Sequence, residues 1–215
     1  MSNMHLKVAI SAGLFLAMAT TARADFLVTL DTSPLSGTHT LAFGLNNGNS
    51  ASNAVALADF SLGGGTAVSG TEDCTFGGVL TGVGCSGELN TQVALGDLDF
   101  QIFFTQQFSA GSMLSFVLST TNNFTPGTPD QFAMHLCDSS LSACYSDDLA
   151  TGAMLLLDLT GGSLSPSAFI LHGAGDQGLS APIVSAVPEP GTLILLGGGV
   201  AALVARKIRR KHVPA

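Results

Sequence analysis

Short apolar runs with a period of two residues constrain the fold of this chain more than any other feature. In each run every second residue is Phe, Leu, Ile, Val or Met, and mostly small or polar residues stand between them. Alternation of this kind predicts strands of an antiparallel sheet with one buried face. The residues expected to share a buried face are Phe26, Val28 and Leu30; Leu41, Phe43 and Leu45; Phe100, Ile102 and Phe104; Leu114, Phe116 and Leu118; Phe132, Met134 and Leu136; and Leu155, Leu157 and Leu159.

Turn-forming residues separate these runs, at positions 46–49, 63–65, 126–129 and 161–162. Segment 51–62 gives the weakest indication of its structure, and no convincing helical stripe occurs between the two termini. Several short strands at this spacing predict an all-β fold, a single antiparallel β-sandwich of jelly-roll type over residues 25–186. A segment of about 160 residues is long enough for one domain with a sizeable core.

Charge is distributed unevenly along the chain. No Lys or Arg lies between Arg23 and Arg206, whereas all fifteen Asp and Glu residues of the chain lie in that stretch. Ion pairs with Lys or Arg therefore cannot stabilise the central domain. Nucleic-acid binding is excluded as a function of the domain, since phosphate contacts need cationic side chains.

The chain has four cysteines, all in the central domain. An even number in an exported protein favours disulfides, although four cysteines allow three connectivities. We expect the local pairs Cys74–Cys85 and Cys137–Cys144, because each brackets a short polar loop. A zinc site is disfavoured because no two cysteines have the C-x₂-C spacing.

The first residues have the pattern of an export signal. Lys7 supplies a positive charge, residues 8–19 are almost wholly apolar, and Ala22 and Ala24 flank Arg23 as in a signal-peptidase site. The apolar part is shorter than the ~20 residues that a membrane-spanning helix needs. We therefore expect residues 1–24 to be a signal peptide that signal peptidase removes, so that the mature chain begins at Asp25.

The last residues combine three ordered features. Pro188, Glu189 and Pro190 come first, the apolar segment 191–205 follows, and the tail 206–215 contains the basic residues Arg206, Lys207, Arg209, Arg210 and Lys211. As a helix the apolar segment would be about 22 Å long against a hydrocarbon core of about 30 Å. We expect a short transmembrane helix that holds the chain transiently in the inner membrane, with its basic end in the cytoplasm.

These features resemble the PEP-CTERM sorting signal of Gram-negative bacteria. The resemblance covers residues 187–215 and does not assign the central domain to a family. It implies that a membrane-embedded exosortase recognises the tail, removes it, and releases or attaches the domain at the cell surface. It also implies an association with exopolysaccharide and with biofilm or floc formation.

Catalytic patterns are weak in the rest of the sequence. Neither a Gly-x-Ser-x-Gly elbow nor a His-Glu-x-x-His motif is present. Glu72 and Glu88 could form a glycosidase pair, but they lie in loop regions where solvation is the expected role. Segment 173–178 matches a dinucleotide fingerprint, yet nearby Pro182 and Pro188 favour a turn. We expect no catalytic residues and no enzyme activity.

One ion-binding hypothesis follows from the acidic composition. Ca²⁺ binds carboxylate and carbonyl oxygens that loops supply, and the best cluster for it is Asp138, Asp147 and Asp148. The alternative is a hydrated acidic surface that keeps the protein soluble. Apart from this possible Ca²⁺, we expect no cofactor.

The sequence thus predicts an exported, non-catalytic protein of the cell surface or extracellular matrix, with exopolysaccharide as a possible partner. Two alternatives stay open: a secreted hydrolase acting on extracellular polysaccharide, and a Ca²⁺-dependent carbohydrate-binding module. Signal peptidase and exosortase are the expected processing partners.

Overall fold

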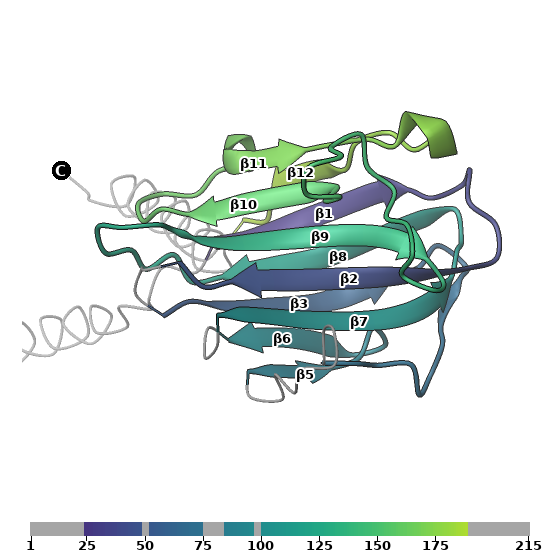
Figure 1. Cartoon of the computed structure of the whole chain (residues 1–215), viewed down its shortest axis with the longest axis horizontal. Coiled ribbons are helices and arrows are strands. Elements are labelled where there is room, and N and C mark those ends of the chain that lie inside the picture. The colour runs from purple at the N-terminus through teal and green to yellow at the C-terminus, as the bar shows by residue number, and fades with distance from the viewer. Residues whose placement is uncertain (1–23, 49–51, 75–83, 97–99, 189–215) are drawn as a thin grey trace, which may run out of the picture.

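The computed structural model describes residues 24–48, 52–74, 84–96 and 100–188 (Figure 1). In these ranges the chain forms strands and two short 3₁₀ helices. The strands are β1 (Ala24–Asp31), β2 (Thr38–Asn46), β3 (Ala54–Ser61), β4 (Thr66–Ala67), β5 (Cys85–Gly87), β6 (Gln92–Gly96), β7 (Gln101–Ser109), β8 (Met113–Thr120), β9 (Asp130–Asp138), β10 (Leu155–Leu159), β11 (Phe169–Leu171) and β12 (Ile183–Ala186). The 3₁₀ helices are η1 (Pro166–Ala168) and η2 (Gly175–Gln177).

The strands form two antiparallel sheets, which Figure 1 views one in front of the other. The first sheet has the order β12-β1-β8-β3-β6-β5, and the second has the order β11-β10-β9-β2-β7-β4. Neighbouring strands in a sheet are often far apart in the sequence, as with β1 beside β8 and β2 beside β7 and β9. The all-β prediction is confirmed.

A single large apolar core joins the two sheets. Phe43 on β2 is fully buried at its centre, 5.4 Å from the Phe116 ring and 6.1 Å from the Phe60 ring of the other sheet, measured between ring centroids. Its neighbours within its own sheet are Phe104 and Phe132. The sheets therefore pack face to face as a β-sandwich does, and side chains of both inner faces make the core.

Five of the six predicted runs have the expected buried face, because a strand presents alternate side chains to the core. Phe100 is the exception. The prediction that it shares the face of Ile102 and Phe104 is wrong, since β7 begins one residue later, at Gln101, and Phe100 is 79% exposed. An alternating sequence pattern cannot show where the pairing with neighbouring strands ends, and here the pattern continues one residue beyond the start of β7.

Segment 51–62, which the pattern left weakly defined, contains β3. The register between β3 and β8 shifts between Ala58 and Ser61, and Asp59 has a positive φ of 54°. Such a bulge interrupts the period-two alternation, because one strand gains a residue relative to its partner. The irregular pattern thus has a structural cause.

The predicted signal peptide, apart from its last residue Ala24, and the predicted transmembrane segment 191–205 lie outside the described residues. Within the described ranges, no helix has the length and apolar character needed to cross a membrane.

Candidate functional site

The residues that follow the predicted signal-peptidase site and those that precede the predicted sorting motif lie next to each other in the fold. Strand β12 pairs with β1, so that Ala186 is opposite Phe26. One residue further on, the backbone N–H of Val187 donates to the carbonyl oxygen of Asp25 at 2.9 Å. The sandwich therefore presents its first and last residues together, with no linker between the last strand and Pro188.

Of the cleavage-site, Pro-Glu-Pro and basic residues predicted for the two signals, only Ala24 and Pro188 belong to the part of the chain that the structure describes. Ala24 is the first residue of β1 and lies opposite Thr120 of β8, and Pro188 is the last residue described. The others lie outside the described residues: Ala22, Glu189, Pro190, Arg206, Lys207, Arg209, Arg210 and Lys211.

Both predicted disulfides are confirmed. Cys74–Cys85 and Cys137–Cys144 have Cα–Cα distances of 5.7 Å and 3.8 Å. The first of them joins the two sheets: Cys74 follows Asp73, which pairs with Thr105 of the second sheet, whereas Cys85 begins β5 of the first sheet. It holds the sandwich together on the side where β4 and β5 lie.

Replacing both Cys74 and Cys85 with Ser should lower the free energy of unfolding by about 3 kcal/mol. The reason is that the bond closes a segment with a sequence separation of 11 and so restricts the unfolded chain. Urea denaturation of the full chain measures the change. The control is Ser86→Ala, an exposed position on β5, which should change stability by less than about 0.5 kcal/mol. A loss as small as that of the control would show that the bond does not stabilise the fold.

The three carboxylates predicted to share Ca²⁺ have separate hydrogen-bond partners. Asp138 accepts hydrogen bonds from the backbone N–H and the hydroxyl group of both Ser140 and Ser142. These bonds, that from the Ser142 hydroxyl above all, hold the pKa of Asp138 at about 2. The side chain therefore closes a tight hairpin loop next to the Cys137–Cys144 bond, as a carboxylate in an Asx turn does.

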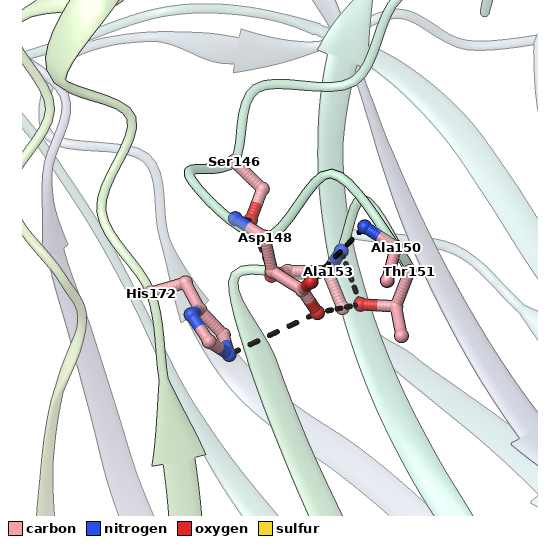
Figure 2. Close-up of polar contacts among 6 residues, drawn as sticks. All are labelled: Ser146, Asp148, Ala150, Thr151, Ala153 and His172. Atoms are coloured by element: carbon pink, nitrogen blue, oxygen red, sulfur yellow. Dashed lines mark hydrogen bonds and ion pairs between the residues drawn. The ribbon is translucent and has the colours of Figure 1, made fainter.

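Asp147 and Asp148 face different segments. Asp147 accepts from the backbone N–H of Gly175 at 3.0 Å, which ties its loop to η2. Asp148 accepts from the Thr151 hydroxyl and the Ala150 N–H, and these bonds lower its pKa (Figure 2). In the described part of the chain, no three His, Cys, Asp or Glu side chains lie close enough to hold a metal ion. The predicted cluster of Asp138, Asp147 and Asp148 is thus corrected: proximity in sequence does not bring these side chains to one point.

Figure 2 shows His172 facing Asp148 across the loop, with its Nε2 atom 3.9 Å from Asp148 Oδ2. Ser146 is also nearby, but its hydroxyl donates to the carbonyl oxygen of Ala153 at 2.6 Å and accepts from the N–H of Asp148. The Ser146 proton is therefore directed at the backbone and away from His172. These side chains together stabilise a loop conformation, and the geometry is unlike that of a Ser-His-Asp triad.

The other two histidines of the domain are built into the sandwich. His39 is buried, with Nε2 3.1 Å from the carbonyl oxygen of Ser36 and Nδ1 3.2 Å from the hydroxyl of Tyr145. Since a carbonyl only accepts, Nε2 is the donor in its hydrogen bond with Ser36. Burial lowers the pKa of His135, which favours its neutral form.

A buried polar network that the sequence did not reveal lies at the start of β9. Asp130 is fully buried, and its two oxygens accept from the Gly48 N–H at 2.9 Å and from Asn53 Nδ2 at 2.6 Å. Asn53 in turn accepts from the backbone N–H of Asn123. Asp130 and Asn53 thus join two connections of the fold, the β2–β3 connection with Gly48 and Asn53 and the β8–β9 connection with Asn123. The hydrogen-bonded residues are 70, 77 and 82 positions apart in the sequence. The only signal of Asp130 in the sequence is an acidic residue directly before an apolar run.

Comparison with known proteins identifies the C-terminal segment. The family model of the PEP-CTERM protein-sorting motif matches residues 186–211. No curated protein and no solved structure matches the chain. The match begins at Ala186, the last residue of β12, so the sorting motif starts where the sandwich ends. Such a motif implies export and sorting to the cell surface with processing by exosortase. The chain therefore carries a PEP-CTERM sorting motif directly after its central β domain, and these comparisons assign that domain to no family.

Proposed function

We propose that the mature chain is a non-catalytic protein of the cell surface that associates with the exopolysaccharide around the cell. The observation that carries this proposal is the sorting motif at residues 186–211, which directly follows the last strand of the domain. In this proposal signal peptidase removes residues 1–24, segment 191–205 holds the chain briefly in the inner membrane, and exosortase then removes the tail.

The roles of the polar side chains support a non-catalytic domain. Asp138 and Asp148 close loops, Asp130 joins connecting segments, and His39 bonds Ser36 and Tyr145. Each of these titratable groups thus already has a structural role. A domain whose titratable side chains have such structural roles suits a protein that works outside the cell by binding.

The strand pairing supports the finer assignment to a jelly-roll-like sandwich. β1 pairs with β8, β2 with β7 and β3 with β6, which is the pairing of a long double ribbon that has wrapped into two sheets. β4 pairs with β7 and β5 pairs with β6, so these two strands lie in different sheets, and the Cys74–Cys85 bond links the segment after β4 to the start of β5. The strands β9 to β12 extend the sheets and return the chain to β1.

The test replaces Pro188, Glu189 and Pro190 together with Ala in the producing bacterium. We expect the wild-type protein on the surface or in the medium, with an intact mass that lacks both the signal peptide and the tail. The variant should keep its tail and stay in the membrane fraction, because exosortase no longer recognises it.

Ser185→Ala is the matched control, since Ser185 is exposed on β12 just before the motif. It should be sorted like the wild type. Recovery of the wild-type chain uncut from the cytosol, with its four thiols reduced, would contradict the proposal.

A further inference from the structure

A row of four polar side chains crosses the outer face of the second sheet. Its members lie opposite one another on adjacent strands: Gln101 of β7 is opposite Asn46 of β2, Asn46 is opposite Gln131 of β9, and Gln131 is opposite Asp158 of β10. We call these four residues the polar row. It covers three spacings between strands, about 14 Å.

The polar row faces outward because its neighbours along the strands face the core. Leu45, Ile102 and Phe132 are buried on the inner face, so the alternate residues lie on the outer one. All four side chains are half-buried, which means that they lie along the sheet surface while part of each meets solvent. Their position at one end of the sheet leaves them clear of the loop that Asp148 closes next to His172.

Hydrogen bonds hold the polar row in two pairs. Gln101 Nε2 donates to Asn46 Oδ1 at 2.8 Å, and Gln131 Nε2 donates to Asp158 Oδ1 at 2.7 Å. Within the described ranges, the side chains of the four residues make no other hydrogen bonds than these two. Each pair therefore keeps amide N–H groups and oxygens that can still donate or accept. The internal bonds fix the orientation of these groups in advance, which lowers the entropic cost of binding.

An apolar row runs beside the polar row on the same face. It consists of Phe103, Gly44, Ala133 and Leu156, which lie two positions from the members of the polar row on the same strands and are themselves buried. Ile170 of β11, opposite Leu156, continues this row. Ile170 is 51% exposed. At the other end of the polar row, Phe100 directly precedes Gln101 and is 79% exposed. The surface that meets solvent thus consists of the polar row together with the exposed side chains of Ile170 and Phe100, and we call it the strip.

We propose that this strip binds a neutral polysaccharide. A sugar ring has hydroxyl groups at its edge, which both donate and accept, and C–H groups on its faces, which pack on apolar and aromatic surface. The ligand is uncharged because no Lys or Arg lies between Arg23 and Arg206, and the polar row itself contains a carboxylate. An acidic polymer would be repelled. This inference rests on the proposed function and names the ligand class and the surface that binds it.

The test uses the full chain in a detergent without sugar headgroups, and polysaccharide washed from the producing cells and separated by anion exchange into neutral and acidic fractions. Affinity electrophoresis should show retardation by the neutral fraction and none by the acidic fraction. Gln131→Ala should weaken the binding about tenfold, since it removes one amide and its bond to Asp158.

Gln92→Ala is the matched control, because it removes the same side chain from an exposed position on β6 of the other sheet. It should bind like the wild type, and thermal melting should show that both variants are folded. No retardation by the neutral fraction, binding of the acidic fraction instead, or equal weakening by Gln92→Ala would overturn the proposal. These results would leave the sorting experiment unaffected, so a failure here is distinct from a failure of the proposed function.

Discussion

Phe43→Ala should lower the free energy of unfolding by about 3–5 kcal/mol, the range for removing a fully buried Phe. Phe43 is 0% exposed, and its ring lies among those of Phe60, Phe104, Phe116 and Phe132. Because those neighbours come from both sheets, the cavity would open at the contact between the layers. Rigid strands on either side limit how far the surroundings can collapse into it. Chemical denaturation of the full chain under oxidising conditions measures the effect.

Phe124→Ala is the control for this truncation. Phe124 is 40% exposed, so the same change should cost less than about 1.5 kcal/mol. Equal losses for the two variants would show that the core does not depend on the ring of Phe43. An unfolded Phe43→Ala protein would agree with the expectation, and Phe43→Leu, which fills part of the cavity, should then recover a folded chain.

Asp130→Ala should lower the free energy of unfolding by about 3 kcal/mol, since it removes the carboxylate that accepts two hydrogen bonds, one of them buried. The carboxyl group accepts from Gly48 and from Asn53, and both bonds join segments that are distant in sequence. In the variant the Asn53 amide loses its buried bond to position 130 and keeps its bond to the carbonyl oxygen of Asn123, while the partly buried Gly48 N–H loses its acceptor. The loss should therefore appear as a lower midpoint in urea denaturation.

Asp130→Asn tests how far one acceptor oxygen can replace the two of the carboxylate. Because the amide keeps one acceptor oxygen, Asp130→Asn should lower the free energy of unfolding by less than Asp130→Ala does. Asp176→Ala, at an exposed position of η2, should change stability by less than about 0.5 kcal/mol. If Asp130→Ala were as stable as the wild type, the network would have no stabilising role.

The faces of the strands could be read from the sequence because period-two alternation is a local property. Leu41, Phe43 and Leu45 are buried as expected, and the same holds for Leu155, Leu157 and Leu159. The local disulfides were also predictable, since each pair brackets a short loop. Phe100 shows the limit of this reasoning: the pattern continues through it, but the pairing of β7 begins only at Gln101.

The carboxylates show a second limit. Asp138, Asp147 and Asp148 are close in sequence, and the direction of each side chain depends on the N–H and hydroxyl groups that its own loop offers. Asp130 shows the reverse case, a solitary acidic residue whose partner Asn53 lies 77 positions away. Hydrogen bonds across such separations depend on which strands are neighbours, and periodicity carries no such information.

The sequence by itself determined the all-β class, the buried face of most strands, the two disulfides and the sorting motif. Each of these features depends on residues that are close to one another along the chain. Only the tertiary structure decided that β12 returns to β1, so that Val187 meets Asp25, and that Gln101, Asn46, Gln131 and Asp158 form one row. These arrangements depend on the order and register of strands, which the packing of the whole core selects.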